Sequence, residues 1–161
     1  MSDPLATYLH DHLAGAEHAI ALLKHMRDKH TGDSLGPFAS GILADIEEDR
    51  ATLRRLAESI GATSHDLKEV TAWLAEKVSR LKLSHTDTDG GLGTFEALEF
   101  LAVGIHGKLA LWRALAAASA SDARLKDLDY EKLSARAQAQ HDKVEQRRLE
   151  AARTALRRTP K

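Results

Sequence analysis

The chain has 161 residues, a formal net charge of −1 and no cysteine. The lack of cysteine excludes disulfides, thiolate metal ligands and a cysteine nucleophile, and a charge near zero gives no general case for nucleic-acid binding. A chain of this length is expected to form one domain, residues 1–161, with a sizeable buried core. The sequence does not open with a basic and then apolar leader, so we expect a soluble, cytoplasmic protein.

Apolar residues recur along the chain at the spacing of helices, and strand-like alternation is almost absent. Ala, Leu, Glu, Lys and Arg dominate the composition, which favours an all-α fold. Gly61 is expected to follow the end of one helix, and Asp129 to cap the start of another. A shorter helix, residues 64–83, is expected between the second and third long helices. The predicted long helices, in chain order, are residues 3–29, 35–60, 94–118 and 130–158.

The segment 94–118 is apolar on nearly every side, which is typical of a helix buried at the centre of a bundle. Charged residues interrupt it, so no run of about 20 apolar residues is left for a membrane span. Thr94 is its expected N-cap. Its far side is expected to contact the helix at 64–83, or else to form a dimer interface. That far side consists of Phe100, Val103, Gly104, Gly107 and Leu111.

The connections between the helices predict how they run relative to one another. A short loop makes the first two long helices antiparallel neighbours. A helix of about 20 residues spans about 30 Å, which is enough to carry the chain from one end of a bundle to the other. The second and third long helices are therefore expected to be parallel, in a four-helix bundle with one long crossover.

Counting residues from these connections places ionisable groups of several helices at one depth. Asp49 is expected level with Lys108, and Lys108 level with about Gln140 and His141. Buried charges must be paired to be tolerated, so we expect an ion-pair network there. A metal site is one alternative. In another, the helices are rotated by about 40° from the expected orientation, and half of the groups are solvated. The predicted layer consists of Asp49, Arg50, Lys108, Glu145 and Arg148.

In topology the chain resembles the ferritin-like superfamily over nearly its whole length. Members of that superfamily carry a Glu on the first helix and Glu-x-x-His on the second, and the third and fourth helices repeat the pattern. Glu17 and Glu47 stand in the corresponding parts of the first two helices. However, Glu47-x-x-Arg50 and Glu145-x-x-Arg148 have Arg in place of the His. The resemblance implies the bundle with an extra crossover helix, and the arginines favour ion pairs in place of a metal pair.

Two classes of function follow from this pattern. The preferred one is a non-enzymatic helical module without catalytic residues or a cofactor, which binds a second copy of itself or another protein. The other is a divergent metal-binding protein with oxidase or storage-type activity that holds iron or manganese. No nucleophile elbow, P-loop or dinucleotide fingerprint occurs, and neither a nucleic acid nor a membrane is an expected partner. Under the metal hypothesis the ligands would be Glu17, Glu47, His141 and Glu145.

Overall fold

The computed structural model describes residues 3–62, 75–76, 79–80 and 91–158. Within this part of the chain the structure is all-α and contains no strand, as predicted. A 3-10 turn, η2 (Ala123–Leu125), precedes the last helix. The helix expected at 64–83 lies outside the described residues, apart from 75–76 and 79–80, which are helical. The long helices are α1 (Pro4–Lys29), α2 (Leu35–Ser59), α4 (Leu92–Ala118) and α5 (Tyr130–Ala155).

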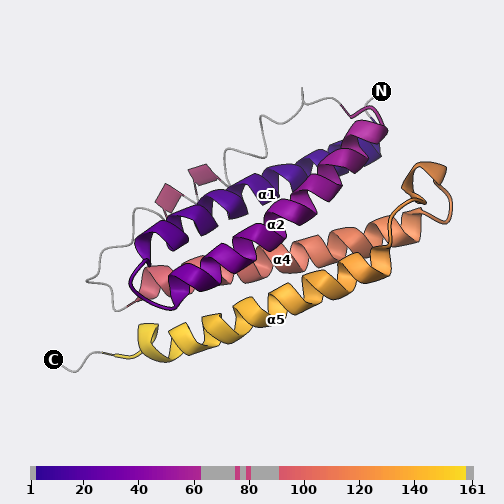
Figure 1. Ribbon diagram of the computed structural model, residues 1–161. Helices are drawn as coiled ribbons and strands as arrows, with labels where there is room; N and C mark the ends of the chain where they lie inside the picture. The colour runs from indigo at the N-terminus through magenta and orange to yellow at the C-terminus, as the bar shows by residue number, and fades with distance from the viewer. Residues whose placement is uncertain (1–2, 63–74, 77–78, 81–90, 159–161) are drawn as a thin grey trace.

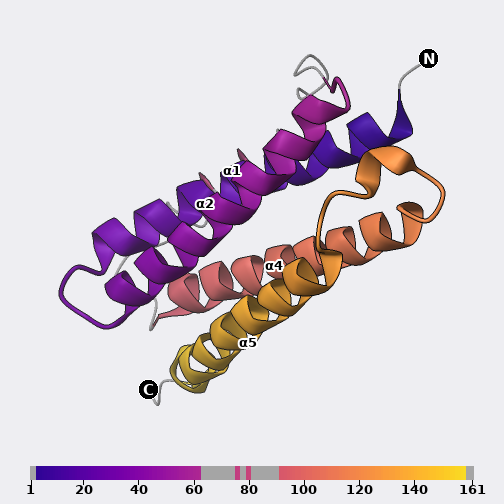
Figure 2. The ribbon, with the colours of Figure 1, turned by 45° about the vertical axis from the view of Figure 1, so that its right-hand side comes forward.

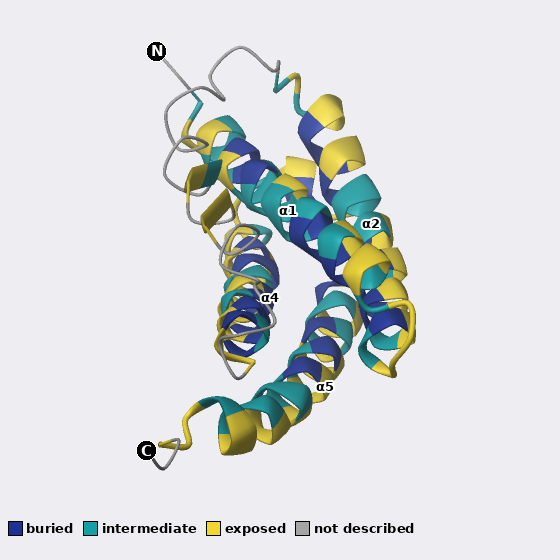
Figure 3. Cartoon of the chain, turned by 90° about the vertical axis from the view of Figure 1, so that its left-hand side faces the viewer, coloured by how far each residue is buried: buried dark blue, intermediate teal, exposed yellow. Residues whose placement is uncertain are grey.

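The four long helices form a bundle of two antiparallel hairpins. Helices α1 and α2 lie side by side in one hairpin, and α4 and α5 lie side by side in the other (Figures 1 and 2). Viewed from the side in Figure 3, the buried faces of the helices turn toward a shared interior. Helices α2 and α4 run parallel, because each begins at the same end of the bundle (Figure 1).

The N-termini of α1 and α5 are capped by aspartate side chains. Asp3 caps α1 by accepting a hydrogen bond from the Leu5 backbone N–H at 3.0 Å. Asp129 caps α5 in the same way, accepting from the Lys132 N–H at 3.0 Å. Side-chain oxygens at these positions satisfy N–H groups that have no partner within the helix.

Four helix ends differ from the expected positions, and two of them differ by more than one residue. Helix α4 begins at Leu92 and not at Thr94, because Gly91 adopts a φ of 87° and turns the chain into the helix earlier. Glycine reaches that left-handed conformation without steric cost. Helix α5 ends at Ala155, before the expected 158, and the next residue, Leu156, is 63% exposed.

The apolar core consists of two clusters stacked along the bundle axis. One cluster extends as far as Ile46 on α2 and Ile105 on α4, and the other begins at Leu53 and Leu109. By length and composition α4 would be able to cross a membrane, a profile that the core helix of a bundle shares. The level between the two clusters is polar, and the candidate site lies there.

Candidate functional site

Three helices each place a polar side chain at the level between the two apolar clusters. Lys108 of α4 donates from Nζ to Oδ2 of Asp49 on α2 at 2.5 Å, and also to Oε1 of Gln140 on α5. Gln140 donates in turn from Nε2 to the same Asp49 oxygen at 3.0 Å. Asp49 is 4% exposed and Gln140 is 2% exposed. The contacts agree with the depths counted from the connections, and they join the two hairpins at mid-bundle.

Arg136 of α5 supplies a second cation to the same carboxylate. Its Nε lies 3.2 Å from Oδ1 of Asp49, so both carboxylate oxygens are engaged. The guanidinium also pairs with Glu48 at 2.7 Å and donates to the backbone oxygen of Asp45 at 3.2 Å. Arg136 was not predicted from the sequence, although it lies one helical turn before Gln140 and therefore on the same side of α5. We name Asp49, Lys108, Arg136 and Gln140 the core cluster.

The charges in the core cluster act on one another. Burial lowers the pKa of the Lys108 ammonium below its usual range, and the neighbouring Asp49 carboxylate only partly opposes that effect. The hydrogen bond from Arg136 lowers the pKa of the Glu48 carboxyl. Burial is tolerable here because each ionised group has an oppositely charged partner within hydrogen-bonding distance.

The other residues of the predicted layer belong to separate ion pairs. Arg50 pairs with Glu17 of α1 at 2.8 Å, because the next residue after Asp49 on a helix points about 100° away from it. Arg148 pairs with Glu145 on its own helix at 2.7 Å and with Glu99 of α4 at 3.0 Å. Among the described contacts, the five residues are thus divided among three groups and do not form one network.

The four side chains of the metal hypothesis do not converge on one point. Glu17 and Glu145 are each engaged by arginines, and Glu47 lies 3.6 Å from the Lys24 ammonium. The His141 ring lies 5.7 Å from the His106 ring, measured between centroids. In the part of the chain that the structure describes, no three His, Cys, Asp or Glu side chains are placed to share a metal ion. These residues therefore do not fit the donor set of a di-metal centre.

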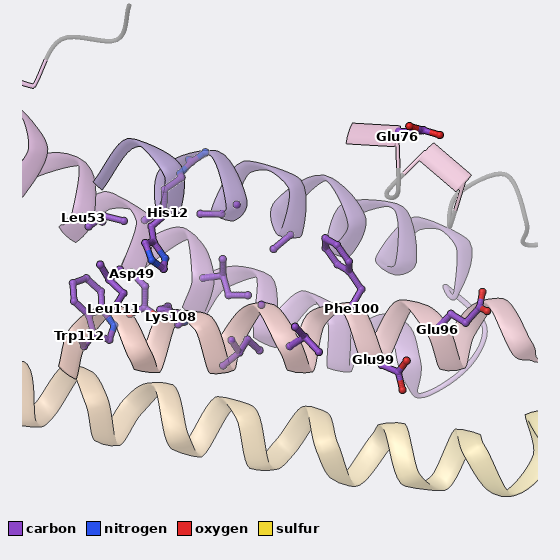
Figure 4. Close-up of a pocket in the computed structure, with 18 of the residues that line it drawn as sticks. His12, Asp49, Leu53, Glu76, Glu96, Glu99, Phe100, Lys108, Leu111 and Trp112 are labelled. Carbon is purple, nitrogen blue, oxygen red and sulfur yellow. Dashed lines mark hydrogen bonds and ion pairs between the residues drawn. The ribbon is translucent and has the colours of Figure 1, made fainter. Parts of the chain in front are cut away.

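A pocket of about 770 Å³ adjoins the core cluster, between α1, α2 and α4. Asp49 and Lys108 line one end of it together with His12 of α1, and Glu96 and Glu99 line the other end (Figure 4). Burial lowers the pKa of His12, which favours its neutral imidazole. The walls between the two ends are apolar or small: Gly15, Ala16, Ala19, Ile46, Phe100, Val103, Gly104 and Ile105.

The pocket was not predicted from the sequence, although some of its residues belong to the far side of α4, which was expected to be an interface. Val103 is 69% exposed, and it lines the pocket together with Phe100 and Gly104. Glu76 and Arg80, from the range expected to cover this side, line it as well. Apart from 75–76 and 79–80, the range 64–83 that was expected to contact this side lies outside the described residues.

Comparisons with protein-family models, with curated protein sequences and with solved structures give no match to this chain. Its function therefore has to be inferred from the core cluster and the pocket beside it.

Proposed function

We propose that the protein is a non-enzymatic, ferritin-like binding module whose core cluster takes the place of a metal centre. The observation that carries this proposal is the Lys108 ammonium, held between Asp49 and Gln140 at the middle of the bundle. A fixed cation at that point repels a divalent metal ion, and it occupies the oxygen atoms that such an ion would need.

The topology supports the ferritin-like part of the proposal. Asp49 and Lys108 are at the same depth on parallel helices, so the chain must leave α2 at one end of the bundle and enter α4 at the other. Such a long crossover between the second and third long helices is characteristic of ferritin-like bundles.

The chemistry of the pocket supports binding and not catalysis. The described residues that line it include no serine, threonine or cysteine, so a hydroxyl or thiol nucleophile is lacking among them. The ammonium of Lys108, which also lines the pocket, is engaged by Asp49 and Gln140. We expect the module to bind a second copy of itself or another protein. Sedimentation equilibrium of the purified chain tests whether it binds a second copy.

Metal analysis tests the proposal most directly. Iron, manganese and zinc are to be measured in protein purified without chelator, and in the Glu145→Gln variant as a comparison. We expect far less than one metal ion per chain in both proteins. Stoichiometric iron or manganese that is lost in Glu145→Gln would overturn the proposal and support the divergent metal-binding protein with oxidase or storage-type activity.

A further inference from the structure

The pocket between α1, α2 and α4 has the size and lining of a small-molecule site. Its volume of about 770 Å³ lies within the range of roughly 300–1,000 Å³ that ligand pockets occupy. Apolar walls with a few polar groups at defined points are the usual composition of such sites. Glycines on two facing helices, Gly15 and Gly104, leave room, since a Cβ added at either would meet no other atom within 4 Å.

The two ends of the pocket differ in charge. The cations Arg50 and Lys108 and the carboxylate of Asp49 line the end beside the core cluster, near His12, whose neutral form is favoured by burial. Arg50 also pairs with Glu17 of α1 at 2.8 Å.

Glu96 and Glu99 lie at the opposite end, on the same side as Glu76 (Figure 4). Glu76 is paired with Arg80 at 2.6 Å, so the carboxylates of Glu96 and Glu99 give this end its negative charge. A long molecule with one anionic end is therefore attracted to the Lys108 end and repelled from the other.

The Lys108 end also retains a hydrogen-bond donor. An ammonium has three N–H groups, and Asp49 and Gln140 accept from two of them. Both oxygens of Asp49 are already engaged by Lys108, Gln140 and Arg136, which reduces its repulsion of a second carboxylate. Oxygen acceptors bearing a negative charge make the strongest bonds to such a donor.

We propose that this pocket binds a long-chain monocarboxylate, a molecule of the fatty-acid class. The carboxylate accepts from Lys108 near Arg50, and the alkyl chain lies along the apolar walls toward Phe100 and Val103. Each CH₂ group that the walls bury adds to the affinity, so the length of the chain determines the affinity and the head group determines the orientation. This inference goes beyond the proposed function, since it depends on the pocket and not on whether the core cluster replaces a metal.

Isothermal titration calorimetry of the full chain with dodecanoate tests the ligand class. Dodecanol carries the same chain without the charge, dodecyltrimethylammonium carries a cation, and butanoate keeps the carboxylate on a short chain. We expect dodecanoate to bind about tenfold more tightly than dodecanol, and butanoate to show no measurable heat. Tighter binding of the cationic amphiphile, or no binding of dodecanoate, overturns the proposal.

A pair of glycine variants tests the location of the site. Gly104→Leu places a side chain in the pocket, and Gly107→Leu places the same side chain on α4 at a position that does not line it. Neither added Cβ meets another atom within 4 Å, so both variants should fold, as circular dichroism will verify. Gly104→Leu should weaken dodecanoate binding about tenfold or more, and Gly107→Leu should leave it unchanged. Equal effects of the two substitutions would place the binding elsewhere and overturn the proposal.

A pair of arginine variants tests the head-group end. Arg50 and Arg54 both pair with Glu17, but only Arg50 is among the described residues that line the pocket. Arg50→Gln should weaken dodecanoate binding about threefold to tenfold without affecting dodecanol, and Arg54→Gln should change neither. If Arg50→Gln weakens both ligands equally, or neither, the carboxylate does not lie at this end. Metal content, which tests the proposed function, is measured on ligand-free protein, so the two proposals fail independently.

Discussion

Lys108 of α4 and Asp49 of α2 form an ion pair at 2.5 Å at the level where the apolar core is interrupted. The two residues belong to different hairpins, so their contact joins the halves of the bundle at its middle. Each is largely buried, with side-chain exposures of 15% and 4%. Removing either one leaves the other's charge in the core without its main partner, which is more costly than never having buried the pair.

Lys108→Met should therefore destabilise the protein strongly, although Met has a similar volume. We expect a loss of about 3–5 kcal/mol in the free energy of unfolding, measured by urea denaturation. Lys24→Met is the matched control, because Lys24 is half exposed and lies 3.6 Å from Glu47. Its loss should stay below about 1 kcal/mol. Equal losses in the two variants would show that the buried ion pair of Lys108 contributes no more to stability than an exposed one.

Removing the charges together should restore much of that loss. Lys108→Met with Asp49→Leu eliminates both buried charges, while Arg136 keeps Glu48 as a partner. Adding Gln140→Leu should restore more, because Gln140 would otherwise be left in the core with an unpaired amide. A coupling energy near zero between Lys108 and Asp49 in the double-mutant cycle would contradict this account.

Arg136→Lys should also destabilise the protein, although it keeps the charge. A lysine cannot reproduce the planar fork that reaches Asp49, Glu48 and the backbone oxygen of Asp45 together. We expect a loss of about 1–3 kcal/mol in thermal or urea unfolding. Arg55→Lys, at an exposed position of α2, should lie within about 0.5 kcal/mol of the wild type. A comparably small effect at Arg136 would mean that its contacts contribute little.

The start of α2 provides a test of close packing against the preceding loop. A Cβ at Gly36 would overlap the backbone carbonyl of His30, which cannot move away as a flexible side chain would. Gly36→Ala should therefore cost about 1–3 kcal/mol. Gly41→Ala on the same helix meets no atom within 4 Å and should stabilise by up to about 1 kcal/mol through helix propensity. Differential scanning calorimetry checks whether the melting temperature falls for Gly36→Ala and rises for Gly41→Ala.

The Arg148–Glu145 pair should make stability depend on acid pH. Hydrogen bonds from Arg148 lower the pKa of Glu145 below its usual range. Between that lowered pKa and the ordinary value near about 4.3, the unfolded chain binds more protons than the folded one. The contribution of Glu145 is therefore fully present above that ordinary value, and it is lost as pH falls through the lowered pKa.

Arg148→Gln should raise the pKa of Glu145 toward its usual range, as measured by carboxyl ¹³C NMR titration. The loss of stability on acidification should become correspondingly smaller. Arg147→Gln is the control, because Arg147 contacts Ser34 and Glu150 on a different side of α5. An unchanged Glu145 titration in Arg148→Gln would show that the pair does not hold the carboxylate ionised.

Which residues reach the middle of the bundle could be judged partly from the sequence. Connection lengths placed Asp49, Lys108 and Gln140 at one depth, and the structure joins them by hydrogen bonds. Depth along a helix follows from a rise of about 1.5 Å per residue, so it can be counted without knowing the packing. The direction of a side chain around the helix axis depends on how neighbouring helices are rotated, so counting residues alone does not decide that Arg50 turns away from Asp49 toward Glu17.

The sequence by itself determined the all-α class, the four long helices and the depth of the polar level, since these depend on periodicity and on the lengths of connections. Only the tertiary structure decided that Arg136 completes the cluster and that a pocket lies beside Lys108. Ion pairs form between whichever charged ends approach within about 4 Å. A pocket is the space that facing side chains leave unfilled, so both depend on distances between helices that no single segment encodes.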